Sequence, residues 1–402
     1  MELSKDLNIN SNLDNLKRGV FGSSLLMKMK MKRILAILVT GFIFSCSGDD
    51  NPSYDNSMTG AVDFDREAML AHWADHIILP AYTDFLSQVN TLETAANAFV
   101  AQPDAIQLES LRTHWETAYN TWQKVSMFEI GPAESINYRL NINIYPANTD
   151  LIHRNIAQGN YNLDLSSNRV AKGFPALDYM LFGLAANDSG LIAQYTGEQA
   201  IAHKQYLLDL IADIKSLTTQ VKNGWDNGYR DSFVTNSGSS ATASVDRYVN
   251  DFIYYYEKHL RAGKMGIPAG VFSGDVVAEN IEGLYHGELS KTNFLIGLNA
   301  IQDFFKGKHY TSEATGPSLA SYLDALNVVK DEVDLSAVIN AQIDQARASV
   351  QTLSPFTTEL QQNPPTTFLE AYDEVQRVVP LMKVDMVSAL SIMIDFVDAD
   401  GD

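Results

Sequence analysis

The sequence has little cysteine, little positive charge and no long apolar run. Cys46 is the single cysteine among 402 residues, so an intrachain disulfide is excluded and packing alone must hold the fold. Lysine and arginine number 29 against 49 aspartate and glutamate residues, which gives a net charge of −20 at pH 7. Such a surface repels phosphate backbones, and nucleic acid is therefore excluded as a partner.

Catalytic signatures are also missing from the chain. It contains no Gly-x-Ser-x-Gly elbow, no glycine-rich phosphate loop and no cysteine free to act as a nucleophile. These absences argue against the common hydrolase and nucleotide-binding classes.

Cys46 ends a short segment that is typical of a secretory signal. Basic residues at positions 28–33 precede an apolar core at 34–44, and a small serine stands before the cysteine. The apolar core is too short for a membrane-spanning helix, which needs about 20 residues. The cysteine after a small residue resembles a bacterial lipoprotein signal, in which this thiol is acylated. We therefore expect residues 1–45 to be a signal region, with the true start between Met27 and Met31.

Residues 46–62 have the composition of a tether. They are polar, acidic and dotted with glycine and proline, which disfavours a packed element. The Ser-Gly-Asp-Asp stretch after Cys46 resembles the surface-export signal of Bacteroidetes lipoproteins. The predicted location is the outer membrane, facing the periplasm or the cell surface, with the lipid anchor as the contact with the membrane.

Helical periodicity dominates the rest of the chain. Apolar residues recur every three or four positions in several segments, which predicts amphipathic helices. The clearest stripes are Leu108, Leu111, Trp115, Ala118, Trp122 and Val125; Leu207, Ile211, Ile214, Thr218, Val221 and Trp225; and Ile339, Ile343, Ala346, Val350 and Leu353. The best candidate for a strand is short, Ile142–Tyr145. The expected fold class is all-α, with two antiparallel helical-bundle domains packed together.

The stretch from 226 to 244 is rich in glycine, asparagine and serine, which predicts a linker. It divides the chain into an N-terminal helical bundle at 63–225 and a C-terminal helical bundle at 245–402. Each part has an ordinary domain size.

One segment, Gly173–Gly183, resembles the signature of the imelysin family, Gly-x-His-x-x-Glu followed by an aromatic residue and Leu-Leu-x-Gly. The segments 122–132, 261–270 and 381–392 also resemble that family and its Bacteroidetes lipoprotein branch. The resemblance spans about residues 60–402. It implies an imelysin-like helical fold, a link to iron or haem acquisition, and a metal-dependent peptidase activity in some members.

The signature is degenerate in this chain. Pro175 stands at the histidine position and has no lone pair for a metal, while Asp178 is one methylene shorter than the glutamate. Ser126 lies near the place where metal-linked members carry an acidic residue. The ligand-binding remnant of the motif is therefore Gly173, Asp178 and Tyr179. The alternative for Asp178, which we favour, is a carboxylate at a helix N-terminus that complements the helix dipole.

Two further groups have the spacing of metal ligands. Glu279, Glu282 and His286 would share one face of a helix and are candidates for a cation, although an acidic solvated stripe is the plainer interpretation. His72 and His76 also have helical spacing, but a pair of surface histidines is favoured over a metal site. No tightly bound cofactor is expected, and iron or haem is the candidate.

The resulting functional prediction is a non-catalytic binding lipoprotein of the imelysin-like type that is associated with iron or haem acquisition. Outer-membrane iron-uptake proteins are candidate partners. One alternative is a metal-dependent peptidase, which needs a metal with an open position. The other is a surface module for a glycan or peptide, whose cleft the aromatic residues Tyr248, Phe252 and Tyr254–Tyr256 could line, although a core role is the commoner one.

Overall fold

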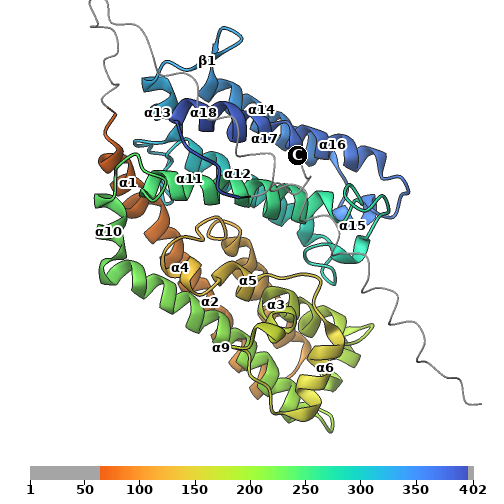
Figure 1. The fold of residues 1–402 in the computed structure, drawn as a ribbon. Coiled ribbons are helices and arrows are strands. Elements are labelled where there is room, and N and C mark those ends of the chain that lie inside the picture. Colours follow the sequence, from red (N-terminus) through yellow and green to blue (C-terminus); the bar gives the residue numbers. More distant parts are fainter. Residues whose placement is uncertain (1–63, 397–402) are drawn as a thin grey trace, which may run out of the picture. The chain divides into compact units, whose positions relative to one another are not determined.

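The computed structural model describes residues 64–396, which form part of one compact unit, Ala61–Asp402. The predicted signal region and tether, including Cys46, lie outside the described residues. Most of the described residues are helical, and the only strands among them form one two-stranded hairpin, which confirms the all-α class (Figure 1).

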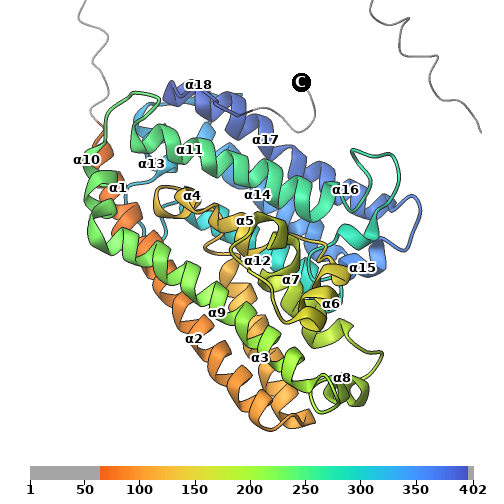
Figure 2. The ribbon, with the colours of Figure 1, turned by 60° about the horizontal axis from the view of Figure 1, so that its bottom comes forward.

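The first bundle is built around three long helices, with α2 packed against both α3 and α9 (Figure 2). Its elements, with η marking 3-10 or π turns, are α1 (Arg66–Trp73), η1 (Ala74–Ile78), α2 (Leu79–Ala101), α3 (Ala105–Trp122), α4 (Pro132–Ser135), α5 (Tyr138–Ile142), α6 (Thr149–Gln158), η2 (Ser166–Ala171), α7 (Gly173–Asp178), η3 (Tyr179–Gly183), α8 (Asp188–Gln194), α9 (Ala200–Gly224), η4 (Trp225–Tyr229) and α10 (Arg230–Thr235).

The second bundle packs α14 against α12 and α16, and it forms the green-to-blue upper part of Figure 1. Its elements are α11 (Ser244–Tyr254), η5 (Tyr255–Gly266), η6 (Ala278–Asn280), α12 (Leu289–Phe305), α13 (Leu319–Ala325), β1 (Val329–Lys330), β2 (Val333–Asp334), α14 (Leu335–Thr352), α15 (Phe356–Glu359), α16 (Thr366–Gln376), α17 (Val378–Pro380), η7 (Leu381–Met386) and α18 (Val387–Leu390). The hairpin pairs β1 and β2 antiparallel.

The apolar stripes predicted on α3, α9 and α14 are all buried, so helical periodicity identified these core faces correctly. The strand expected at Ile142–Tyr145 was wrong. Ile142 is the last residue of α5, and the chain then runs irregularly toward Pro146. The sheet forms instead at 329–334, where Asp331 and Glu332 take the left-handed conformation of a tight turn.

The segment between the bundles is more helical than its composition suggests. Helix α9 continues through η4 and α10 to Thr235, with a kink at Asn227 and Gly228, where the backbone leaves helical angles. Residues 236–243 are then irregular. The domain limits expected around 226–244 stay a prediction.

Aromatic side chains hold the two bundles together. Trp73 from α1 contacts Tyr248 of α11 and Phe304 of α12, with ring centroids 5.4 and 4.9 Å away. Phe128, in the loop after α3, reaches the same two rings at 6.1 and 5.9 Å. Offset and tilted contacts of this kind are favourable beyond the area that they bury. The interface is therefore an apolar core and not a hinge between independent bodies.

Gly173 is required where α7 starts. Its φ of +74° is left-handed, and a Cβ there would lie 2.0 Å from the carbonyl oxygen of Ile142. Gly159 ends α6 with a similar φ of +61°, but a Cβ at this position would have no atom within 4 Å. Both glycines have a positive φ that disfavours a side chain. Only at Gly173 would a Cβ also collide with a neighbouring atom.

We predict that Gly159→Ala lowers the free energy of unfolding by about 1 kcal/mol, the cost of a left-handed alanine. Gly173→Ala should cost about 3 kcal/mol or more, because a backbone carbonyl cannot move aside as a side chain can. Urea denaturation followed by circular dichroism measures both. Equal losses for the two variants would show that the close approach to Ile142 is absent.

Candidate functional site

The motif segment lies at the junction of the two bundles. Pro175 is buried in the first turn of α7, and Asp178 is the last residue of that helix. The interpretation of Asp178 as an N-terminal helix carboxylate was therefore wrong. Its carboxylate instead accepts hydrogen bonds from the backbone N–H groups of Tyr285 and His286, at 2.9 and 3.0 Å. Asp178 thus fastens the first bundle to the loop that precedes α12.

Burial governs the acidity of this carboxyl group. Asp178 is 2% exposed, and desolvation raises its pKa from 3.8 to about 7. The two backbone N–H donors oppose the rise in pKa, and the negative charge of nearby Glu282 adds to it. The structure therefore brings together two of the carboxylates that the sequence singled out, Asp178 and Glu282.

Glu282 accepts a buried network of hydrogen bonds. Lys264 of η5 donates its ammonium group to one carboxylate oxygen of Glu282. The amides of Asn143 and Gln123 donate to the other oxygen at 2.7 and 3.2 Å. Lys264 also donates to the carbonyl oxygen of the Gln123 side chain at 2.8 Å, so Lys264, Gln123 and Glu282 are hydrogen-bonded to one another.

Both members of this ion pair lie out of water. Glu282 is 1% and Lys264 is 4% exposed. Desolvation lowers the pKa of Lys264, and the charge of Glu282 counteracts this. The hydroxyl of Tyr119 donates to Asn143 at 2.7 Å, and its ring stacks on Phe174 of the motif at 4.5 Å. The network therefore lies directly against the motif helix.

The side chains at the motif do not fit a metal ion. Pro175 offers no ligand atom, and both oxygens of Asp178 are bound to backbone N–H groups. The carboxylate of Glu282 is bound to an ammonium group and two amides. Ser126, near the position of a further acidic ligand, donates to the hydroxyl of Tyr255 at 2.8 Å. The positive charge that a metal would bring is already supplied by Lys264.

The remaining predicted residues lie around this centre. The helix expected over 279–286 is replaced by the short turn η6 and an irregular loop, in which Gly283 has a φ of +70°. Glu279 is exposed, and His286 stacks on Phe182 at 4.6 Å. Glu279, Glu282 and His286 form no metal-binding cluster among the residues that the structure describes.

Tyr179 is buried beside the motif. Its hydroxyl lies 2.6 Å from Nε2 of His153, and its ring contacts that of Tyr285 at 5.0 Å. The assignment of Gly173, Asp178 and Tyr179 to ligand binding stays a prediction.

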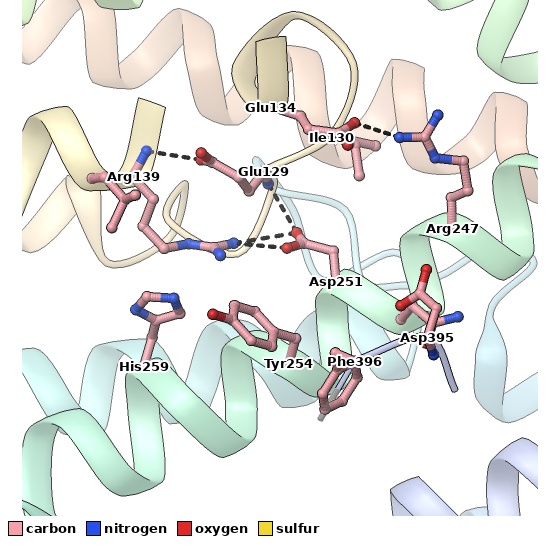
Figure 3. Close-up of a pocket in the computed structure, with 12 residues that line it drawn as sticks. Glu129, Ile130, Glu134, Arg139, Arg247, Asp251, Tyr254, His259, Asp395 and Phe396 are labelled. Carbon is pink, nitrogen blue, oxygen red and sulfur yellow. Dashed lines mark hydrogen bonds and ion pairs between the residues drawn. The ribbon is translucent and has the colours of Figure 1, made fainter. Parts of the chain in front are cut away.

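A cavity of about 340 Å³ opens elsewhere along the bundle interface (Figure 3). One wall comes from the loop and short helices at 129–140, and the other from α11, η5 and the last described residues. Arg139 crosses between the walls and donates to both carboxylate oxygens of Asp251 at 3.2 Å. Asp251 also accepts from the backbone N–H of Glu129 at 2.9 Å, and Glu129 accepts from that of Arg139 at 2.8 Å.

The titratable groups of this cavity are strongly perturbed. Desolvation raises the pKa of Glu129 to about 7, against the opposing effect of Arg139. Desolvation is also the main cause that lowers the pKa of His259 well below its usual value. The positive charges of Arg139 and Lys264 lower this pKa further. The cavity therefore presents a neutral imidazole, the hydroxyl of Tyr254 and several carboxylates. Perturbed groups in a cavity are typical of a functional site.

Several of these residues were missed by sequence reasoning. Lys264 was noted only as part of a family segment, although a lysine within an otherwise apolar stretch is a signal of a buried charge. Arg139, Asp251 and Glu129 carried no spacing that would connect them, since the hydrogen bonds that join them form only in the folded chain. Of the aromatic set expected to form core, Tyr254 alone lines the cavity, and the others are buried.

Comparisons with known proteins identify the scaffold. The Imelysin family profile matches residues 78–378, and the chain belongs to this family. Two solved structures resemble it in fold: an imelysin-like protein from Psychrobacter arcticum, with a TM-score of 0.62 and 19% identity, and a precursor of iron-regulated protein A from Parabacteroides distasonis, with a TM-score of 0.65 and 18% identity. Each comparison covers 82% of this chain and 97% of the other.

A curated relative, Iron-regulated protein A of Synechococcus elongatus, is 23% identical over 175 residues. The match covers 42% of this chain and 45% of the relative, so the chain matches less than half of that protein's length. Among the described residues, no helix is both long and apolar enough to cross a membrane.

We predict that Lys264→Met lowers the free energy of unfolding by about 3–5 kcal/mol, because it leaves Glu282 charged and buried without its partner. The double variant Lys264→Met with Glu282→Gln should recover much of this loss, since no charge then remains. Chemical denaturation measures all three proteins.

The control for the ion-pair experiment is Arg247→Met, which removes a half-exposed pair with Glu134 and should cost less than about 1 kcal/mol. A loss of that small size for Lys264→Met would contradict the buried ion pair, as would a double variant no more stable than the single one.

A second prediction concerns pH. Because the pKa of Asp178 is higher in the folded than in the unfolded chain, its stabilising contribution is complete below 3.8 and is lost as the pH rises through about 7. Asp178→Asn cannot titrate, so its stability should fall less steeply between these pH values. Glu129 titrates in the same range, and the comparison must therefore be made against the wild type and against exposed Asp373→Asn. Identical slopes in all three proteins would contradict the raised pKa of Asp178.

Proposed function

We propose that this imelysin-family protein is a non-catalytic binding protein of the cell envelope that takes part in iron acquisition. The observation that carries this proposal is the buried ammonium group of Lys264. It neutralises Glu282 beside the motif, whereas a metal-dependent peptidase needs a metal cation with an open coordination position. A lysine on η5 can bind neither a substrate carbonyl nor an activated water as a metal does.

The link to iron rests on relatives and on the family. The names of the Synechococcus and Parabacteroides proteins both describe them as iron-regulated. Regulation by iron is a property of expression, and it does not require iron to be bound at the motif. A protein that recognises a ligand or a partner during iron limitation is consistent with the names of these relatives. It is also consistent with motif carboxylates that are already hydrogen-bonded.

The cavity of Figure 3 is the best candidate for the binding site. Its volume of about 340 Å³ lies at the lower end of the range for small-molecule sites. The carboxylates of the lining outnumber its guanidinium groups by four to two: Glu129, Glu134, Asp251 and Asp395 against Arg139 and Arg247. Tyr254 and Phe396 contribute aromatic faces. Carboxylates beside aromatic rings favour a small cationic ligand, because cations are attracted both by the charges and by the ring faces. The size disfavours a large macrocycle such as haem.

Attachment to the outer membrane is part of the same proposal. It is supported by the lipoprotein-like segment that ends at Cys46 and by the acidic, tether-like composition of residues 46–62. An acidic domain on a tether would remain free of anionic headgroups, since like charges repel.

The proposal predicts that expression of the gene rises under iron limitation and that a deletion strain then grows more slowly than its parent. Complementation with the wild-type gene should restore growth. Growth curves with and without an iron chelator measure the effect, and fitness and expression that are indifferent to iron would contradict the role in iron acquisition.

The absence of catalysis is tested on the purified protein. We expect no cleavage of a mixed peptide library, measured by mass spectrometry. Cleavage that a chelator abolishes and that Asp178→Asn also removes would establish the peptidase alternative.

Anchoring is tested separately by the substitution Cys46→Ala. The wild type should sediment with outer membranes, whereas the variant, which has no thiol for acylation, should appear in the soluble fraction. Sedimentation of the variant with the membranes would contradict the proposed lipid anchor.

A further inference from the structure

Three histidines converge near the start of the first bundle, apart from the motif helix and its ion pair. His72 in α1 and His76 in η1 lie one turn apart, and His309 comes from the loop after α12, 233 residues beyond His76 in the chain. One ring nitrogen from each lies within 4.8 Å of the other two. The ring centroids are 5.2, 5.0 and 4.3 Å apart. The prediction that His72 and His76 are merely two surface residues was wrong, because His72 is buried and a third histidine joins them.

A proline explains why His309 lies there. Pro80, in the first turn of α2, has no N–H and cannot bond to the carbonyl oxygen of His76 four residues earlier. The backbone N–H of Tyr310 donates to that carbonyl oxygen instead, at 2.9 Å. The N–H of His309 is bound to the carbonyl oxygen of Ala314 at 2.8 Å. The loop is therefore attached to the helix at the residue beside His309, and the ring of His309 stacks on that of His76.

His72 is held in the state that binds metals. Its Nε2 lies 2.9 Å from the carbonyl oxygen of Gly307, which can only accept, so Nε2 carries the hydrogen and Nδ1 keeps its lone pair. A metal-binding imidazole usually donates its other N–H in this way.

Only glycine fits beside the edge of the His72 ring that carries Nδ1. A Cβ at Gly316 would lie 2.4 Å from both Nδ1 and Cε1 of His72. Any larger residue at this position would therefore cover the nitrogen that has the lone pair. Gly307, whose φ is +68°, turns the chain so that its carbonyl meets Nε2 on the other side of the ring.

We propose that His72, His76 and His309 form a binding site for a divalent transition-metal ion, with three imidazole ligands and one open position. Imidazole suits zinc, copper, nickel and iron(II) better than it suits magnesium or calcium. Metal–nitrogen bonds of about 2.0–2.1 Å in a tetrahedral arrangement place ligand nitrogens roughly 3.3 Å apart. Small side-chain rotations of the exposed His76 and the half-buried His309 close the remaining gap.

The open position faces accessible space. His76 is exposed, and His309 forms part of the wall of a cavity of about 440 Å³, together with Tyr310, Lys124 and Lys308. A metal held by three neutral imidazoles keeps its full positive charge, so water or an anionic ligand group can complete its coordination. This site is separate from the motif and from the cavity of Figure 3, and it does not depend on the proposed role in iron acquisition.

The test is a titration of the purified, metal-free full chain with Zn²⁺ by calorimetry. We expect one ion per chain at micromolar affinity or tighter, and with Co²⁺ the visible absorption of a tetrahedral complex. Removal of a residue that only hydrogen-bonds to a metal ligand weakens metal affinity about 10–100-fold. Removal of a ligand itself should cost at least as much, so we expect His76→Ala and His309→Ala each to weaken zinc binding by about 10–100-fold or more. The melting temperature of the wild type should also rise with zinc concentration.

His114→Ala is the matched control, because it removes a histidine of α3 that lies outside the cluster, and its affinity should equal that of the wild type. His76 is exposed, so its variant remains informative if His309→Ala fails to fold. Circular dichroism confirms folding of each variant. Absence of binding at high micromolar zinc, or undiminished binding by a folded His76→Ala variant, would overturn the site. Neither result bears on growth under iron limitation.

Discussion

The junction of the two bundles depends on a charge that is balanced without water. Glu282 and Lys264 lose their hydration when the bundles pack, and each would be costly alone. The amides of Asn143 and Gln123 donate hydrogen bonds to Glu282, and Gln123 also accepts one from Lys264. These bonds replace the water that both charged groups lose. A buried pair of this kind adds little net stability compared with apolar residues of similar volume, whereas removal of one partner is strongly destabilising.

The same junction engages the carboxylates beside the motif helix. A metal site would need carboxylates and an imidazole with free lone pairs, whereas each carboxylate oxygen of Asp178 and Glu282 already accepts a hydrogen bond. Asp178 is bound to backbone N–H groups of the loop before α12, and Glu282 to side chains from both bundles. These hydrogen bonds serve the packing of the bundles, and Asp178 and Glu282 are part of the interface.

Sequence reasoning predicted the parts of the fold that depend on local pattern. The helix class and the buried faces of α3, α9 and α14 follow from periodicity, because each stripe needs only its own segment to be recognised. The position of Asp178 within its helix was misjudged, since α7 begins at Gly173 for a steric reason that involves distant Ile142. Lys264, Asp251 and His309 were not predicted as site residues because their partners lie more than one hundred residues away or belong to segments without a regular period. Tertiary packing brings these side chains together, and their contacts cannot be predicted from residue spacing in the sequence.

The lysine at the junction has one more consequence. A cation that is attached by peptide bonds cannot dissociate, be exchanged for a competing ion or be captured by a siderophore. The charge balance of Glu282 is therefore built into the chain and does not depend on a dissociable ion.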